Sequence, residues 1–205
     1  MSRKDKTAET DRLICNFTGG AVKHRFRFGG GRGQALPKAV GMKGGKTPMV
    51  VDATAGLGRD AFLLASLGAK VTLIERSPYM HGLLAEGLAS ARKNGGDVAE
   101  VISRMTLLHG DARDLLSTLS PEVVLVDPMH PPRKKSALVK NEMRLIREII
   151  GTDEDSVELM TEALATASKR VVLKWPLRAD PMEGICCASH QIVGKSTRYD
   201  VFMVG

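Results

Sequence analysis

Short apolar runs alternate along the chain with longer segments in which apolar residues recur at helical spacing. The apolar runs predict strands at residues 49–51, 70–74, 105–109, 122–126 and 170–173, and a last strand pair at 191–193 and 199–204. The helical spacing predicts helices at residues 61–67, 78–93, 141–150 and 156–167. Strands that alternate with helices indicate an α/β protein with a mostly parallel, doubly wound sheet.

The first predicted strand leads into a turn that contains two glycines and ends in Arg59-Asp60. Gly56 and Gly58 allow a tight backbone turn and leave room for a ligand near the amides at the start of the next helix. Strand, glycine turn and helix together form the opening unit of a nucleotide-binding sheet. A glycine turn that binds no ligand is the simpler alternative.

This turn does not match the dinucleotide fingerprint. A G-x-G-x-x-G count from Gly56 meets Ala61 where the third glycine is required. Asp60 would repel a pyrophosphate, whereas it suits a ligand with an ammonium group or hydroxyls, such as the methionine end of S-adenosylmethionine. An NAD-dependent dehydrogenase is therefore a poor interpretation.

Acidic residues follow the first three predicted strands at positions that suit a bound nucleoside. Asp52 ends the first strand, and Glu75 ends the second, 23 positions later, near the roughly 20-residue offset of an acid that accepts ribose hydroxyls. Asp111 follows the third strand and could accept a hydrogen bond from an adenine amine. Each acid has a simpler alternative, because Glu75 could be a surface residue or helix cap, and Asp111 or Asp114 could cap a helix.

The fourth predicted strand ends in Asp127-Pro128-Met129-His130. The Asp127 carboxylate and the Pro128 carbonyl are two acceptors, which can hold both hydrogens of an exocyclic amine and direct its nitrogen at an electrophile. A target base could then stack on Met129 or His130. These four residues are the predicted catalytic residues, and a proline-rich turn without chemistry is the alternative.

Composition is that of a soluble, single-domain protein. The chain has 205 residues, of which 43% are hydrophobic and 26% charged. The sequence contains no apolar run of membrane-helix length and begins with polar residues that lack a signal-peptide core. The three cysteines lack metal-type spacing, so we expect a cytoplasmic protein without structural disulfides, a metal or a membrane partner.

The net charge of +7 is concentrated in part of the chain, since no Asp or Glu occurs between Arg12 and Val51. Residues 23–28 alternate basic and aromatic side chains, and a glycine-rich stretch follows. This pattern favours contact with RNA phosphates, although an edge strand with Phe26 and Phe28 in the core would give the same alternation. We therefore expect a basic N-terminal segment at residues 1–46 and an enzymatic domain at 47–205. The predicted RNA-binding residues are Lys23, Arg25, Arg27, Arg32, Arg133, Lys134, Lys135 and Lys140.

Several strings carry a more specific signal. They are Asn16-Phe17-Thr18-Gly19-Gly20-Ala21, Phe28-Gly29-Gly30-Gly31-Arg32-Gly33-Gln34, Val51-Asp52-Ala53-Thr54-Ala55-Gly56-Leu57-Gly58-Arg59-Asp60-Ala61-Phe62, Glu75-Arg76, Asp127-Pro128-Met129, Lys135-Ser136-Ala137-Leu138-Val139-Lys140 and Glu142-Met143-Arg144. Together they resemble the RsmJ family of small-subunit (16S) ribosomal RNA guanine-N2 methyltransferases, from about residue 16 to the C-terminus.

The resemblance implies a class I (Rossmann-like) methyltransferase fold with an antiparallel C-terminal strand, S-adenosyl-L-methionine as cofactor, and ribosomal RNA or the small subunit as partner. It implies cofactor contacts at Arg59-Asp60, Glu75-Arg76, Asp111-Ala112 and Asp127. With Asp52, Gly56 and Gly58 from the strand and turn, these form the predicted cofactor-binding set.

The chain departs from the family pattern at three places. Family members have a longer segment before residue 16, Phe or Tyr where this chain has His130, and often a small hydroxyl residue at the position of Asp111. Two alternatives stay open at this stage. One is methylation of another amine, such as adenine N6 or a protein side chain, and the other is a non-catalytic ribosomal RNA-binding module that retains the fold.

Overall fold

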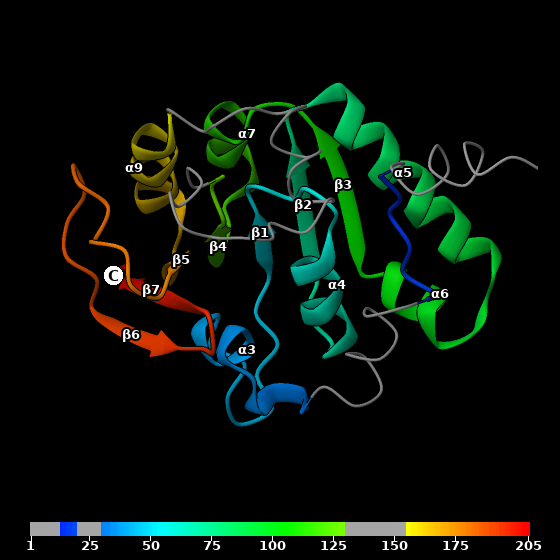
Figure 1. The fold of residues 1–205 in the computed structure, drawn as a ribbon, viewed down its shortest axis with the longest axis horizontal. Helices are drawn as coiled ribbons and strands as arrows, with labels where there is room; N and C mark the ends of the chain where they lie inside the picture. Colours follow the sequence, from blue (N-terminus) through cyan, green and yellow to red (C-terminus); the bar gives the residue numbers. More distant parts are fainter. Residues whose placement is uncertain (1–12, 20–29, 130–154) are drawn as a thin grey trace, which may run out of the picture.

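Among the residues that the structure describes, seven strands form one sheet in the order β3-β2-β1-β4-β5-β7-β6 (Figure 1). The computed structural model describes residues 13–19, 30–129 and 155–205. β1, β2, β3, β4 and β5 pair in parallel, and β7 runs antiparallel to both β5 and β6. The predicted doubly wound sheet with an antiparallel C-terminal strand is therefore confirmed.

The strands are β1 (Val50–Asp52), β2 (Val71–Glu75), β3 (Met105–His109), β4 (Val123–Val126), β5 (Arg170–Pro176), β6 (His190–Val193) and β7 (Thr197–Met203). The helical elements are η1 (Gly31–Gly33), α3 (Ala35–Ala39), α4 (Arg59–Ser66), α5 (Pro78–Lys93), α6 (Gly96–Ile102), α7 (Ala112–Leu119) and α9 (Ser156–Thr166). Among the helices of the described residues, none is long and apolar enough to cross a membrane.

The predicted elements agree closely with the observed ones where the apolar pattern is strong. The predictions for α5 and β3 match both bounds, whereas α4 begins at Arg59, two residues before the predicted start, because Gly58 is its N-cap. The short helix α6 was not predicted, since it buries only Val101 and Ile102 and follows the glycines that end α5. The predicted helix at 141–150 and the basic–aromatic residues 23–28 lie outside the described residues.

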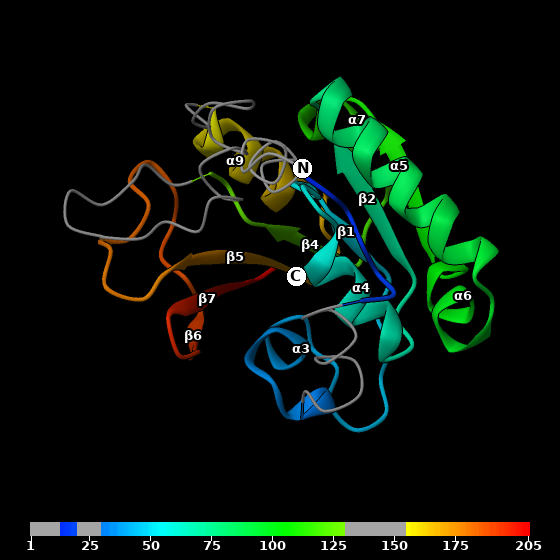
Figure 2. The ribbon, with the colours of Figure 1, turned by 45° about the vertical axis from the view of Figure 1, so that its right-hand side comes forward.

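Helices cover both faces of the sheet, and alternate residues of each strand face opposite layers. Val50 and Leu125 belong to one buried cluster, which includes residues from α3, α4, α5 and α6. Val51 and Val124 belong to a second cluster, which includes residues from α7 and α9. Figure 2 shows the helices on either side of the central strands. This two-sided burial explains why the central strands are continuous apolar runs.

The described residues before β1 pack into the same core as the sheet. Phe17 is 2% exposed and its ring stacks on Phe62 of α4, with 5.2 Å between ring centroids. Leu36 and Ala39 of α3 are also buried in the first cluster. The described part of the predicted segment 1–46 thus packs on the predicted domain 47–205, and its contact with RNA stays a prediction.

Gly87 provides the close contact between α5 and the segment around Cys15. A Cβ at position 87 would lie 2.6 Å from the Cys15 carbonyl oxygen and 2.9 Å from the Cys15 Cβ. We expect Gly87→Ala to lower the free energy of unfolding by about 1–3 kcal/mol, because a backbone segment must move to admit the methyl group. Urea denaturation followed by circular dichroism measures this change.

Gly82, in the same helix, provides the matched control. A Cβ there would meet no atom within 4 Å. We expect Gly82→Ala to be neutral or to stabilise by up to about 1 kcal/mol, since alanine favours helix more than glycine does. Equal stability of the two variants would show that residues 13–19 do not pack on α5 as described.

Candidate functional site

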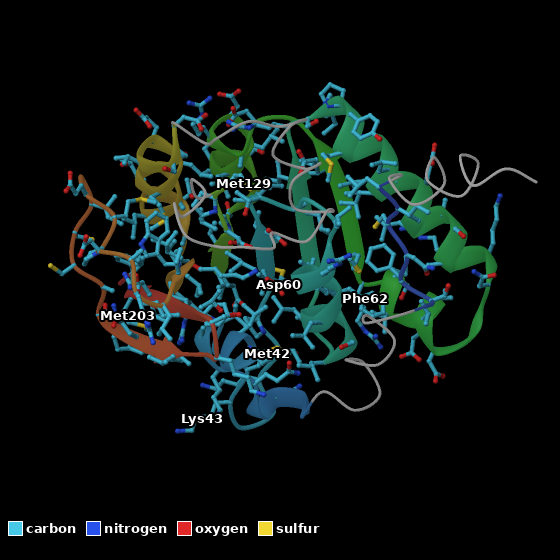
Figure 3. All side chains as sticks on the ribbon, in the orientation of Figure 1. Met42, Lys43, Asp60, Phe62, Met129 and Met203 are labelled. Atoms are coloured by element: carbon cyan, nitrogen blue, oxygen red, sulfur yellow. The ribbon has the colours of Figure 1, made fainter. Side chains whose placement is uncertain are left out.

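A pocket of about 360 Å³ lies at the carboxyl ends of the parallel strands. The parallel register places the ends of β1, β2 and β4 at one edge of the sheet, where Asp52, Glu75 and Asp127 all line the pocket. Figure 3 shows Met129 near the upper end of the sheet, and Met42 and Lys43 near its lower end. Carboxyl ends of strands are the usual ligand site of open α/β sheets.

The side chain of Glu75 binds the backbone of the glycine turn. Its Oε2 accepts a hydrogen bond from the Gly56 amide at 2.9 Å, and its Oε1 accepts one from the Ser77 amide at 2.9 Å. Gly56 has a φ of +53°, a conformation that favours glycine. Each carboxylate oxygen has a further lone pair, so this geometry is compatible with the predicted contact between Glu75 and ribose hydroxyls.

Gly58 is not one of the residues that line the pocket, and it packs closely against neighbouring side chains. Its φ is +67°, and a Cβ there would lie 2.8 Å from Leu84 Cδ1 and 3.3 Å from Phe17 Cζ. Gly58 was predicted to bind the cofactor, but the structure gives it a packing role at the start of α4. Ala61, at the position of the missing third glycine, is fully buried.

Asp52 is buried beneath the pocket, where its side chain is close to other carboxylates. Its Oδ1 accepts a hydrogen bond from the Thr54 amide at 3.2 Å, and the residue is 3% exposed. Burial and the neighbouring charges of Asp60 and Asp127 raise its pKa to about 7, although the Thr54 bond and Lys174 oppose the shift. Asp52 is therefore partly protonated near neutral pH.

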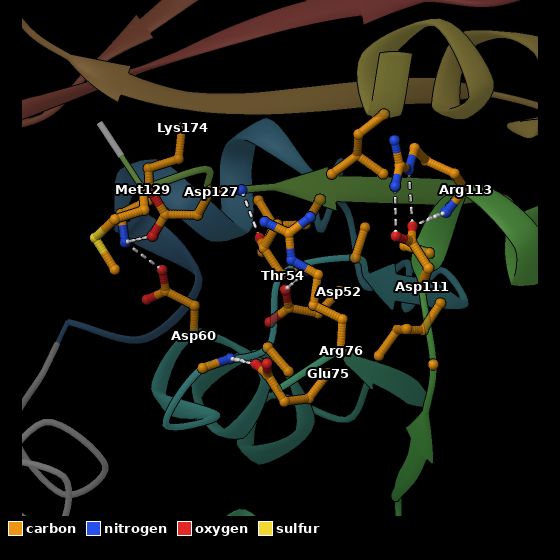
Figure 4. A pocket seen from close by; sticks show the side chains of 18 of the residues that line it. Asp52, Thr54, Asp60, Glu75, Arg76, Asp111, Arg113, Asp127, Met129 and Lys174 are labelled. Carbon is orange, nitrogen blue, oxygen red and sulfur yellow. Dashed lines mark hydrogen bonds and ion pairs between the residues drawn. The ribbon is translucent and has the colours of Figure 1, made fainter. Parts of the chain in front are cut away.

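Lys174 bridges two of the predicted site residues. Its Nζ lies 2.7 Å from Asp60 Oδ2 and 2.6 Å from Asp127 Oδ2 (Figure 4). Val126 pairs with Leu173 in the sheet, so the next residue on each strand, Asp127 and Lys174, come side by side. The Asp127 amide also donates to Thr54 Oγ1 at 2.7 Å, which fixes the backbone where β4 ends.

A second set of charged residues, joined by ion pairs, also lines the pocket. Asp155, at the N-terminus of α9, forms ion pairs with Arg76 at 2.6 Å and with Arg113 at 3.1 Å. Arg113 also binds Asp111 at 2.7 Å, and its hydrogen bonds hold the pKa of Asp111 below its usual range. Asp111 caps α7 through the Arg113 amide, as one predicted alternative stated, and it lines the pocket as well.

The pocket gathers most of the predicted cofactor residues. Those that line it are Asp52, Gly56, Arg59, Asp60, Glu75, Arg76, Asp111, Ala112 and Asp127, together with the predicted catalytic residue Met129. Pro128 is buried beside them. His130 lies outside the described residues.

The predicted RNA-binding residues are for the most part not described. Only Arg32 of that set lies in the described part of the chain. Its guanidinium donates to the carbonyls of Lys46 at 2.9 Å and Leu67 at 3.0 Å. Leu67 follows the C-terminal end of α4, whereas the pocket lies at the N-terminal end of this helix. Arg32 therefore forms its hydrogen bonds at the edge of the sheet opposite to the pocket.

The sequence interpretation missed four polar residues that line the pocket: Thr54, Arg113, Asp155 and Lys174. Thr54 lies within the glycine-turn string, and its place after the acid that ends β1 was a usable signal. Lys174 directly follows the predicted fifth strand, so the expected pairing of that strand with the fourth would have placed it beside Asp127. Asp155 belongs to an acidic turn with no local pattern that predicts contact with Arg76 or Arg113.

The pocket fits a nucleoside that carries positive charge. Six carboxylates and four cationic side chains line it, which gives a formal excess of negative charge. The lining also includes the apolar residues Ile74, Leu125 and Leu159, of which Leu159 is partly exposed. Its volume is in the range of small-molecule sites, and its acids suit an ammonium or sulfonium better than a pyrophosphate. These features match S-adenosylmethionine.

Comparison with known proteins gives the same result. A family model described as "Putative SAM-dependent methyltransferase" matches residues 1–204. The chain is 68% identical over 196 residues to ribosomal RNA small subunit methyltransferase J of Agrobacterium fabrum, covering 96% of this chain and 94% of that protein. It is also 68% identical to the protein of that name in Brucella anthropi, covering 99% and 98%.

A solved structure agrees with the fold. The SAM-dependent methyltransferase NGO1261 from Neisseria gonorrhoeae has a TM-score of 0.71 and 34% sequence identity, covering 93% of this chain and 74% of that one. The fold, the pocket and the family model define a class I S-adenosylmethionine-dependent methyltransferase. Within this class, the chain belongs to the ribosomal RNA small subunit methyltransferase J (RsmJ) family, which confirms the resemblance and the predicted cofactor.

The raised pKa of Asp52 makes stability depend on pH. In the unfolded chain this group returns to a pKa near 3.8, so the folded protein binds the proton more tightly. Its stabilising contribution is complete below about pH 4 and is lost as pH rises through about 7. From this group we expect the free energy of unfolding to fall by about 2 kcal/mol between about pH 5 and pH 8.

Asp52→Asn should lack this component, which urea denaturation at several pH values measures. Asp97→Asn, at an exposed site on α6, is the control and should retain the slope of the unmodified protein. If the Asp52→Asn curve runs parallel to that of the unmodified protein, Asp52 titrates normally in the folded state.

Proposed function

We propose that this chain transfers the methyl group of S-adenosylmethionine to the exocyclic N2 amine of a guanine in small-subunit ribosomal RNA. The observation that carries the proposal is the position of Asp127-Pro128 at the carboxyl end of β4, where Asp127 lines the cofactor pocket. The guanine specificity rests on the family resemblance, together with the capacity of this site to hold an amine.

Asp127 offers its carboxylate toward the pocket. Its side chain keeps 40% of its surface exposed although Lys174 binds one of its oxygens. The Thr54 hydroxyl accepts a hydrogen bond from the Asp127 amide and so fixes the backbone at the end of β4, and the Pro128 carbonyl is the second acceptor that we propose for the amine. An exocyclic amine that donates to both acceptors has its nitrogen lone pair oriented in one direction.

The main task of these residues in methyl transfer is to position the target amine. S-adenosylmethionine supplies a methyl group on a sulfonium, which is already a strong electrophile. The protein therefore has to hold the amine in line and exclude water, and a strong general base is not required. Asp60 lies in the first turn of α4, where its charge suits the methionine end of the cofactor. Met129 offers an apolar surface to an extruded base.

The RNA partner is supported by the relatives and by charge. The two relatives at 68% identity are both named as ribosomal RNA small subunit methyltransferases. The net charge of +7 favours a polyanionic substrate. We propose that Arg133, Lys134, Lys135 and Lys140, which follow Asp127-Pro128-Met129-His130 in the sequence, contact phosphates beside the target base. We propose that Lys23, Arg25, Arg27 and Arg32, nearer the N-terminus, contact phosphates elsewhere on the RNA, because Arg32 lies at the edge of the sheet opposite to the pocket.

Incubation with labelled S-adenosylmethionine and small ribosomal subunits that lack the modification tests the function. We expect label at one guanine of the ribosomal RNA, in the form of N2-methylguanine on nucleoside analysis. Label on adenine N6 or on a ribosomal protein would show that the chain is a methyltransferase that acts on another amine. Absence of label in RNA and protein would contradict catalysis on the subunit.

Replacing Asp127 tests the residue that holds the amine. We expect Asp127→Ala to lower kcat by roughly 10²–10³-fold, because the amine loses a charged acceptor. The melting temperature should stay close to that of the unmodified protein, and single-turnover transfer measures the rate. Asp97→Ala, on the exposed face of α6, should retain full activity. Unchanged turnover in Asp127→Ala would remove Asp127 from the mechanism.

Cofactor binding can be tested without RNA. We expect S-adenosylhomocysteine at about 100 times its Kd to stabilise the fold by about 2.7 kcal/mol, seen as a rise in Tm by differential scanning fluorimetry. NAD should give no rise, since Asp60 repels its pyrophosphate. A fold that S-adenosylhomocysteine does not stabilise would indicate a ribosome-binding module without a working cofactor site.

A further inference from the structure

The pocket contains one lysine, Lys174, that the cofactor and amine contacts proposed above do not use. It lies on β5, where its side chain is 23% exposed, and it lines the pocket beside Asp127. Its ammonium lies 2.7 Å from the Asp60 carboxylate and 2.6 Å from the Asp127 carboxylate. Figure 4 shows Lys174, Asp127 and Asp60 together, with Asp60 approaching from α4.

The ends of β1 and β4 and the start of α4 bring together acids that repel one another. Asp52 from β1, Asp60 from α4 and Asp127 after β4 surround the same region, and Lys174 is the cation that contacts two of them. Two carboxylates in one site raise the pKa of at least one member unless a cation is present. A protonated Asp127 would be a weaker acceptor for an amine, because its charge would be lost.

We propose that Lys174 is a positioning residue for methyl transfer, whose ammonium keeps the Asp127 carboxylate ionised and fixed in place against the cofactor residue Asp60. This inference rests on the proposed function of Asp127 as the acceptor of the target amine. The Lys174 ammonium touches Asp127 and Asp60, and it acts on the reaction through them.

The charge balance of Lys174 supports this role. Burial alone would lower its pKa, but the Asp127 and Asp60 carboxylates outweigh burial and raise the pKa above its usual value. Lys174 therefore stays protonated across the working pH range and is no candidate for a general base. Thr54, in the turn after β1, fixes the backbone amide of Asp127, while Lys174 fixes its carboxylate from β5, so Asp127 is held at two points.

Lys174→Met tests the proposal, because it keeps most of the length of the unbranched side chain and removes its charge. The rate of single-turnover transfer to small ribosomal subunits is measured across pH. We expect the rate at neutral pH to fall at least 10-fold, and the acid limb of the pH profile to move up by about one pH unit or more, because Asp127 beside Asp60 then binds a proton more tightly. Lys174→Arg keeps the charge and should retain the acid limb of the unmodified protein.

Lys169→Met is the matched control. Lys169 immediately precedes β5 and also pairs with a carboxylate, at 2.5 Å from Glu122 Oε1, but at the opposite end of the strand. We expect this variant to keep both the rate and the pH profile. Titration calorimetry with S-adenosylhomocysteine accompanies each variant, and Lys174→Met should bind it with a Kd within about fivefold of the unmodified protein, which separates loss of transfer from loss of cofactor binding.

The outcomes distinguish this inference from the proposed function. If the unmodified protein methylates the subunit and Lys174→Met has an unshifted pH profile, Lys174 has only a structural role and the inference is wrong. If Lys174→Met loses S-adenosylhomocysteine binding by far more than fivefold, its role is in the cofactor site and the inference is also wrong. If the unmodified protein transfers no methyl group, the proposed function fails first.

Discussion

Parallel pairing of β1, β2, β4 and β5 is the constraint on which the site depends. Parallel strands end at the same edge of a sheet, so residues that follow different strands meet there although they are far apart in sequence. Asp52, Glu75, Asp127 and Lys174 come together in this way. A change of register by one residue in β4 would turn Asp127 to the other face of the sheet and separate it from Lys174.

Charge compensation is the second requirement of this arrangement. The pocket collects carboxylates from β1, α4 and the end of β4, and burial together with their repulsion raises the pKa of Asp52 to about 7. Lys174 offsets the charges of Asp60 and Asp127, while Arg76 and Arg113 offset Asp155 and Asp111. The pocket keeps an acidic excess that suits a positively charged cofactor, and its cations fix the geometry of the acids.

The glycine turn differs from the turn of a dinucleotide-binding unit in its helix contacts and charge. Gly56 provides the backbone bend that Glu75 holds from the next strand, whereas Gly58 leaves space for Leu84 and Phe17. Ala61 is fully buried where a dinucleotide-binding turn has its third glycine. Asp60 then occupies the first turn of the helix, where a pyrophosphate would otherwise bind, and takes part in the network of Lys174 and Asp127.

The sequence by itself determined the fold class, most strand and helix positions, the family and many of the residues that line the pocket, while their contact with the cofactor stays a prediction. These features are encoded locally: apolar runs mark buried strands, and acids and glycines directly follow the strand ends. Tertiary structure decided how those residues interact. The Lys174 bridge depends on the register of β4 and β5, the Asp155 contacts depend on the docking of α9, and the packing role of Gly58 depends on Leu84 from α5. Such contacts join residues that are distant along the chain, and the local patterns used for the sequence predictions do not contain them.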